Sequence, residues 1–294
     1  MRVVALGGGH GLAVTLAALR LLGEEPTAVV TVADDGGSSG RLRRDLGLPA
    51  PGDLRMALLA LADPAAEASR LFAYRFQRGD LAGHNLGNLA LAALTDLEGG
   101  FLEALETAAR WLRVRGRVLP ATLVPVRLLG RVDGREVLGQ AVLTRAPGRV
   151  EAVWLEPGDP AAVPAAVAAV HHADLVLLGP GSTFTSVVPN LLVPELGKAV
   201  AAAGERVVYV CNLEPQQGET TGFAPEAHLA AILDHCPGLV VPRVLCQRPA
   251  AAAVAAEAAA FAALGARVIH AQVAGDEPGR HDPRRLARAL EALA

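Results

Sequence analysis

The chain has 294 residues and a formal net charge of −3, with 52% hydrophobic and 19% charged side chains. This size and composition suit one large α/β unit with a substantial core, and the charge leaves no basic excess for a nucleic-acid backbone. The three cysteines form no Cys-x-x-Cys pair, and no apolar run has the length and flanks of a membrane span. We therefore expect a cytoplasmic protein without nucleic-acid or membrane partners.

Strand and helix patterns alternate in the first part of the chain. Strands are predicted at 2–8 and 27–35, and helices at 11–23, 52–63, 83–97 and 101–114. The first helix closes at Gly23, and Asp53 is the expected cap of the second. A strand–helix–strand unit of this kind implies a parallel sheet.

The chain changes character between residues 117 and 157. Strand-like runs there, with turn signals at Asp133-Gly134 and Pro147-Gly148, predict a small antiparallel insertion. The alternation then returns, with strands predicted at 174–182, 205–213, 238–246 and 266–273 and helices at 161–173, 187–204, 224–236, 250–264 and 282–293. We therefore predict a single α/β domain over 1–294. It has a Rossmann-like parallel sheet with helices on both faces and a β-rich insertion at about 117–157.

Unusual turns follow four of the predicted strands, at residues 7–11, 34–40, 179–182 and 212–221. In an open parallel sheet, ligands sit at the carboxyl ends of the strands. Glycines at such ends let the backbone, and the N–H groups of the next helix, approach a phosphate. Leu12 stands where a dinucleotide fingerprint has its third glycine, so the first turn is either a phosphate contact or a tight strand-to-helix turn.

Paired polar side chains mark two further places. Asp34 and Asp35 end the second strand, where carboxylates hold ribose hydroxyls or a divalent cation; a helix cap or solvated turn is the simpler alternative. Asn85 and Asn88 share one face of a helix start, where amides bind a base, a sugar or a phosphate, or cap the helix. No Ser-His-Asp context and no metal-binding helix motif names a general base.

Five motifs, in order, resemble those of one known family. They are "GGGHG", "TVADDGGSSGRLRRDLGLPAPGDLR", "GHNLGNL", "GPGSTFTSVVPNLLVPEL" and "YVCNLEPQQGETTGF". The chain resembles the YvcK proteins, called gluconeogenesis factors, which belong to a larger CofD-like group with the phospholactate transferase of deazaflavin coenzyme synthesis. The resemblance runs from residue 3 to "GRHD" at 279–282.

The resemblance implies a regulator that binds a nucleotide sugar, in particular UDP-N-acetylglucosamine. Such a protein acts on carbon metabolism, cell shape and peptidoglycan synthesis, with protein partners in cell-wall synthesis and assembly into homo-oligomers. The alternative is a Mg²⁺-dependent phosphotransferase of the 2-phospho-L-lactate transferase type, with Asp34 and Asp35 as catalytic residues and Asp35 as a metal ligand. Carried over by position, the ligand contacts are Gly8, Gly9, His10, Gly11, Asp34, Asp35, Ser38, Asn85, Asn88, Gly181, Ser182, Asn212, Thr220 and Arg280.

Two places depart from the family pattern. His10 stands where the family motif has Thr, and an imidazole also donates to phosphate. The run "EPQQGETTG" differs from the usual family run before Pro-Gly-Glu-Thr, so the sugar specificity stays open.

Overall fold

Seven parallel strands form the main sheet, in the order β10-β9-β8-β7-β1-β2-β3. The computed structural model describes residues 1–293 of the chain. The strands are β1 (Val3–Gly7), β2 (Thr27–Val30), β3 (Arg117–Pro120), β7 (Leu175–Leu178), β8 (Val207–Val210), β9 (Arg243–Gln247) and β10 (Arg267–Ala271). Every residue of β1, β7 and β8 is buried. These strands are continuous apolar runs because helices cover both faces of a parallel sheet.

The strand order reverses between β1 and β7. From β1 the chain builds outward through β2 to β3, and it then returns to add β7, β8, β9 and β10 on the other side of β1. The connections that leave the carboxyl ends of β1 and β7 run to opposite faces, and doubly wound sheets bind ligands in the crevice between such connections. The predicted fold class, a Rossmann-like parallel sheet with helices on both faces, is confirmed.

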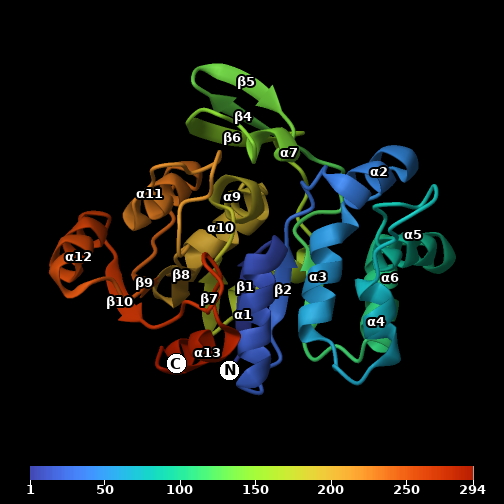
Figure 1. Cartoon of the computed structure of the whole chain (residues 1–294), viewed down its shortest axis with the longest axis horizontal. Coiled ribbons are helices and arrows are strands. Elements are labelled where there is room, and N and C mark those ends of the chain that lie inside the picture. Colours follow the sequence, from blue (N-terminus) through green and yellow to red (C-terminus); the bar gives the residue numbers. More distant parts are fainter. Residues whose placement is uncertain (294) are drawn as a thin grey trace.

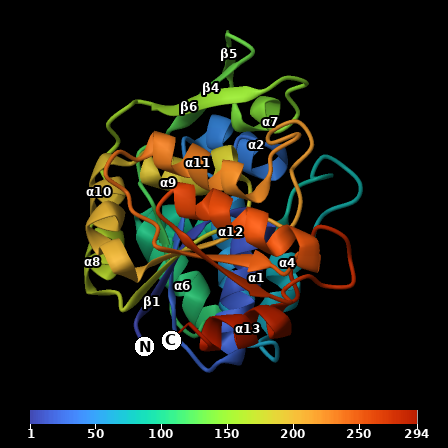
Figure 2. The same ribbon diagram turned by 90° about the vertical axis from the view of Figure 1, so that its left-hand side faces the viewer.

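Helices flank both faces of the sheet. Figure 2 shows α1 and α13 on one side and α8 and α10 on the other.

Among residues 1–293, no helix combines the length and the apolar character needed to cross a membrane. The helices are α1 (Gly9–Leu21), α2 (Gly37–Leu46), α3 (Pro51–Leu61), α4 (Glu67–Ala73), α5 (Leu86–Glu98), α6 (Phe101–Trp111), α7 (Gln140–Leu143), α8 (Pro164–His172), α9 (Val188–Leu191), α10 (Pro194–Ala203), α11 (Pro225–His235), α12 (Val254–Ala263) and α13 (Pro283–Glu291), with short π or 3₁₀ turns η1 (Thr183–Val187), η2 (Gly204–Arg206) and η3 (Ala251–Ala253).

A second, antiparallel sheet stands at the carboxyl end of the main sheet. Its strands β4 (Arg127–Val132), β5 (Arg135–Leu138) and β6 (Val150–Glu156) lie in the order β5-β4-β6, and α7 follows β5. The predicted Asp133-Gly134 turn joins β4 to β5, with φ angles of 47° and 74° that suit a tight hairpin. Figure 1 shows this insertion at the top, opposite α13 and the N-terminus. Strand β3, although within 117–157, belongs to the main sheet.

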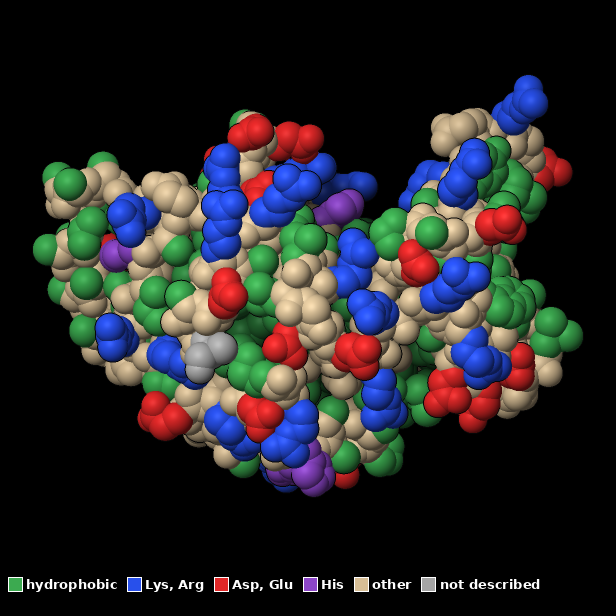
Figure 3. Space-filling view, turned by 90° about the horizontal axis from the view of Figure 1, so that it is seen from below, with side chains coloured by type: hydrophobic (Ala, Val, Ile, Leu, Met, Phe, Trp, Pro, Cys, Tyr) green, Lys and Arg blue, Asp and Glu red, His purple; other side chains and the backbone are tan. Residues whose placement is uncertain are grey.

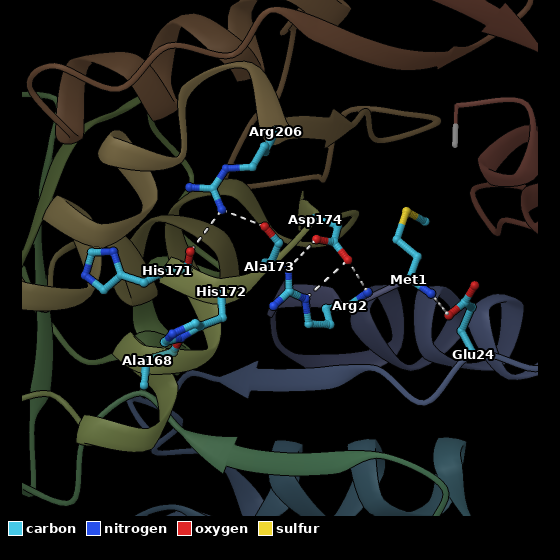
Figure 4. Close-up of polar contacts among 9 residues, drawn as sticks. All are labelled: Met1, Arg2, Glu24, Ala168, His171, His172, Ala173, Asp174 and Arg206. Atoms are coloured by element: carbon cyan, nitrogen blue, oxygen red, sulfur yellow. Dashed lines mark hydrogen bonds and ion pairs between the residues drawn. The ribbon is translucent and has the colours of Figure 1, made fainter.

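The amino ends of the strands form the opposite pole of the molecule. There Arg2 donates to the carboxylate of Asp174 at 2.7 to 3.3 Å, and Arg206 donates to the carbonyl oxygens of His171 and Ala173 (Figure 4). The hydrogen bonds from Arg2 lower the pKa of Asp174 to about 2. On the face seen from below, acidic and basic side chains are interspersed (Figure 3). The bonds between Arg2 and Asp174 tie the start of β1 to the start of β7.

Candidate functional site

A pocket of about 490 Å³ lies at the point where the strand order reverses. Its wall comes from the loops after β1, β2, β7 and β8, the first turn of α3, the insertion, and the loop before α13. The residues predicted from the sequence that line it are Gly8, Gly9, His10, Gly11, Asp34, Gly181, Ser182 and Asn212. The structure thus brings parts of all four strand-end turns to one place.

The first turn of α1 forms one end of this pocket. Gly8 is extended and provides no side-chain cap. Asp53 accepts the N–H of Gly9, so the N–H groups of His10 and Gly11 and the positive end of the helix dipole are left for another partner. A Cβ on Gly8 would overlap the carboxylate of Asp53, and one on Gly11 would overlap the carbonyl oxygen of Pro180. Glycine is therefore needed for close packing here, and the arrangement leaves backbone amides where an anion binds.

Glu219 occupies the corresponding helix start on the β7 side. Its buried carboxylate accepts hydrogen bonds from the N–H groups of Phe184 and Thr185 at 2.6 and 3.1 Å, and from Thr185 Oγ1 at 2.9 Å. Burial raises the pKa of Glu219. A protein carboxylate thus satisfies the amides that follow β7, whereas at the start of α1 Asp53 meets only the N–H of Gly9, so α1 keeps amides for a ligand anion.

The loops after β7 and β8 bond to each other in the pocket wall. Gly181 donates its N–H to Asn212 Oδ1 at 2.9 Å, and Ser182 Oγ donates to Gln216 Oε1 at 2.5 Å. Thr220 is buried behind this wall, where its hydroxyl oxygen accepts the N–H of Gln216 at 2.8 Å. Thr220 therefore supports the predicted contact residues without lining the pocket itself.

Two carboxylates face the pocket beside the start of α1. Asp34 Oδ1 accepts the N–H of Gly36 at 2.9 Å, and burial raises the pKa of Asp34 above its ordinary value. Asp53 accepts the N–H of Gly9, and burial, followed by the charge of Asp34, raises the pKa of Asp53 to about 7. A buried carboxyl beside a second carboxylate favours a neutralising partner, which is a proton or a cation.

Sequence reasoning gave Asp53 only a capping role, and that role is wrong. Ala50 is the N-cap residue of α3, and Asp53 lies in the first turn with its carboxylate bonded to α1. No strand directly precedes Asp53, so the rule about strand ends does not find it. Its neighbour Gly52 is a usable signal, because a Cβ there would lie 2.3 Å from Ser39 Oγ and 3.2 Å from Asp34 Oδ2, so glycine lets the start of α3 approach the turn after β2.

Asp35 does not line the pocket and bonds instead to the insertion. Its two carboxylate oxygens accept the N–H groups of Gln140 and Ala141, at 3.1 and 2.9 Å. Gln140 and Thr144, which sequence reasoning missed, are the insertion's contribution to the pocket wall. The predicted metal ligand is thus engaged with backbone donors at the start of α7.

Ser38, Asn85 and Asn88 lie together outside the pocket wall. Asn85 caps α5 by accepting two backbone hydrogen bonds, and its own N–H donates to Ser38 Oγ at 3.3 Å. Asn88 Oδ1 accepts a hydrogen bond from Arg55 Nε at 2.9 Å, and burial lowers the pKa of Arg55 to about 10. The charge of Arg55 acts in turn on Asp53. Asn88 and Arg55 therefore act on the pocket through the charge near Asp53, without lining the pocket wall.

A second pocket, of about 700 Å³, adjoins the first between α1, α3 and the loop before α13. Arg280 lines this second pocket and pairs with Glu277 at 2.9 Å, with both side chains exposed. Burial lowers the pKa of the neighbouring His281 to about 4, so its ring is neutral at pH 7. The two pockets share His10, Gly11, Gly279 and His281, so one ligand can extend through both.

Among residues 1–293, no group of three or more His, Cys, Asp or Glu side chains is arranged to hold a metal ion. Three carboxylate side chains line the pocket, those of Asp34, Asp53 and Glu214, and the first two lie beside the start of α1. This donor set fits Mg²⁺ bound together with phosphates, because Mg²⁺ keeps several waters and takes one or two protein carboxylates in such sites.

Doubly wound proteins with an uncapped helix start at the reversal of strand order form a broad class of phosphate-ligand binders. Comparison with known proteins shows the family of the chain. The family described as 2-phospho-L-lactate transferase CofD matches residues 3–288, and the chain belongs to this family.

Relatives with substantial identity carry the name gluconeogenesis factor. That of Bacillus subtilis strain 168 is 44% identical over 236 residues, covering 80% of this chain and 74% of that protein. That of Halalkalibacterium halodurans is 44% identical over 245 residues, covering 83% and 76%. A crystal structure of a UPF0052 family protein from Bacillus halodurans matches with a TM-score of 0.90 at 38% identity, covering 99% of this chain and 98% of that one. The family resemblance expected from the motifs is confirmed.

Proposed function

We propose that the chain binds a UDP-sugar, with UDP-N-acetylglucosamine as the expected ligand, and acts as a regulatory protein. The observation that carries this proposal is the uncapped start of α1, whose first residues line the pocket where the strand order reverses. A helix start of this kind recognises the diphosphate, the part that all nucleoside diphosphate sugars share.

A diphosphate at the start of α1 lies next to Asp34 and Asp53. These carboxylates and the phosphates repel one another unless a proton or a cation lies between them. The proposal therefore includes Mg²⁺ held by Asp34, Asp53 and the ligand, where it neutralises this charge. The pKa of about 7 for Asp53 supports this, since that carboxyl already favours a neutralising partner.

The adjoining pocket accommodates a further part of the ligand. Its wall on α1 and α3 includes Ala13, Val14, Met56 and Leu59. An apolar wall suits the flat face of a base, and the fork of Arg280 at the rim suits phosphate oxygens. On the insertion side of the first pocket, Gln140 and Thr144 offer amide and hydroxyl groups to a sugar.

The names of the relatives favour regulation of carbon metabolism. The same proposal extends to cell shape and peptidoglycan synthesis in the cytoplasm, because UDP-N-acetylglucosamine is a precursor of the wall. It includes proteins of cell-wall synthesis as partners and a homo-oligomeric state.

Isothermal titration calorimetry with UDP-N-acetylglucosamine, with and without Mg²⁺, tests the binding. We expect saturable binding that weakens when Mg²⁺ is chelated and in Asp34→Asn. Asp96→Asn, a matched change of an exposed carboxylate on α5, leaves it unchanged. No heat and no thermal shift at millimolar ligand would refute the proposal.

A second candidate is a Mg²⁺-dependent phosphotransferase of the 2-phospho-L-lactate transferase type, which the family match over residues 3–288 favours. It predicts a new product from nucleotide-activated donors, detected by mass spectrometry, and loss of that product in Asp34→Asn and Asp53→Asn. Binding without any product supports the regulator, and Mg²⁺-dependent product supports the transferase.

A further inference from the structure

Asp35 joins the main domain to the insertion at the edge of the pocket. Its Oδ2 accepts the N–H of Gln140 and its Oδ1 accepts the N–H of Ala141, across 105 and 106 residues of sequence. Gly139, just before α7, has a φ angle of +107°, and a Cβ there would lie 2.6 Å from Asp35 Oδ2. Glycine is therefore needed both for the backbone conformation and for the approach of the carboxylate.

Helix α7 is built into the insertion. The N–H of Gly139 donates to the carbonyl oxygen of Leu128 on β4 at 2.8 Å, and the side chain of Leu143 is fully buried. A Cβ on Gly130 of β4 would lie 2.6 Å from Leu143 Cδ2, so the helix and the strand are in tight contact. The contact of Asp35 with α7 consequently fixes the position of the small sheet as well.

Two side chains at this place line the pocket. Gln140 Nε2 donates to Thr144 Oγ1 at 3.1 Å, and both residues belong to the pocket wall. Their amide and hydroxyl groups are neutral, so they suit the hydroxyl or acetamido groups of a sugar better than a phosphate. The insertion thus adds neutral recognition groups to a pocket whose carboxylates and open helix start come from the main domain.

We propose that Asp35 is a positioning residue that orients Gln140 and Thr144 to hydrogen-bond to the sugar, while the adjacent Asp34 acts at the diphosphate end of the ligand. The proposal rests on the proposed UDP-sugar binding and adds the origin of its selectivity. Asp35 acts through α7. Its replacement therefore lowers the affinity for the sugar nucleotide relative to UDP and leaves the binding of the diphosphate unchanged.

Other contacts keep the insertion in place when Asp35 is changed. His235 Nε2 accepts the N–H of Val153 on β6 at 3.0 Å, and Gly218 packs against the carbonyl oxygen of Thr144. The loss of the Asp35 contact therefore loosens α7 locally and leaves the fold intact.

A double-mutant cycle tests the proposal, with Asp35→Asn, Gln140→Ala and the pair titrated with UDP-N-acetylglucosamine and with UDP. We expect Gln140→Ala to weaken binding of the sugar nucleotide about tenfold, as for one lost hydrogen bond, and to leave UDP affinity unchanged. Asp35→Asn shows the same selective loss. The double variant binds no worse than Asp35→Asn, because the two residues act as one unit.

Hydrogen exchange gives an independent readout of the contact. In Asp35→Asn we expect faster exchange at residues 139–144. Asp34→Asn, the matched control, leaves this exchange unchanged and weakens both ligands. If Asp35→Asn fails to fold, Gly139→Ala breaks the same contact from the side of α7 and carries the same expectations.

Three outcomes would overturn the positioning role: equal losses for UDP and its sugar conjugate, additive effects in the double variant, or unchanged exchange at 139–144. If the unaltered protein binds neither ligand, the proposed function fails instead. The exchange measurement still decides in that case whether Asp35 holds the insertion.

Discussion

Replacement of Asp53 is expected to change stability and ligand binding in opposite directions. Burial, followed by the charge of Asp34, raises the pKa of Asp53 from 3.8 to about 7. The folded protein therefore binds this proton more tightly than the unfolded chain does. Consequently the free energy of unfolding falls as the pH rises between these two values, and the loss is complete above the folded pKa.

The size of this effect follows from the shift. At about 1.36 kcal/mol per pKa unit, a shift from 3.8 to about 7 corresponds to at most about 4 kcal/mol. Because the side chain borders an open pocket, solvent screens the charge, and we expect about 2 kcal/mol. Asp53→Asn removes the titrating group, keeps the side-chain shape, and retains an oxygen for the N–H of Gly9.

Urea denaturation across the pH range measures the difference. We expect Asp53→Asn to match the unaltered protein near pH 4 and to be about 2 kcal/mol more stable near pH 8, while Mg²⁺-dependent ligand binding is lost. Asp96→Asn serves as the control and follows the unaltered protein throughout. Parallel curves of stability against pH for Asp53→Asn and the unaltered protein would refute the reasoning.

Further predictions concern the groups around the pocket. Glu219→Gln keeps the side-chain shape but loses one carboxylate oxygen that accepts from the amides after β7. We expect the free energy of unfolding in urea to fall by about 2 kcal/mol. An unchanged urea midpoint would count against this role of Glu219. Gly11→Ala places a Cβ against the carbonyl oxygen of Pro180, so calorimetry should show affinity weakened at least about tenfold. In its control, Gly158→Ala, the new Cβ lies 3.7 Å from the carbonyl oxygen of Leu155, which is an ordinary contact, so this variant should bind normally. Arg55→Met removes a positive charge that lowers the pKa of Asp53, so the pH midpoint of Mg²⁺-dependent binding should rise; a fixed midpoint would contradict the coupling.

The convergence of the glycine turns could be predicted because it depends on local rules. Continuous apolar strands imply a parallel sheet, and a parallel sheet places all its carboxyl ends at one edge. Gly8, Asp34, Gly181 and Asn212 come from four different strand ends, and they line one pocket for that reason. The hairpin at Asp133-Gly134 was predictable on the same basis, since its residue types specify the turn.

The finer division of roles depends on distant contacts that no local pattern reports. Asp34 and Asp35 look alike in the sequence, and only the position of α7, about a hundred residues later, separates a pocket carboxylate from one that holds the insertion. Asn85 was expected either to bind or to cap, and it caps α5. Asp53 needed the packing of α3 against α1 before its carboxylate could be placed.

The central claim is that a diphosphate binds at the uncapped start of α1. A crystal structure of the protein with UDP-N-acetylglucosamine and Mg²⁺ tests it most directly. We predict diphosphate density within hydrogen-bonding distance of the backbone N–H groups of His10 and Gly11, with Asp34 and Asp53 on the metal. A diphosphate bound elsewhere on the protein, away from these amides, would contradict the account.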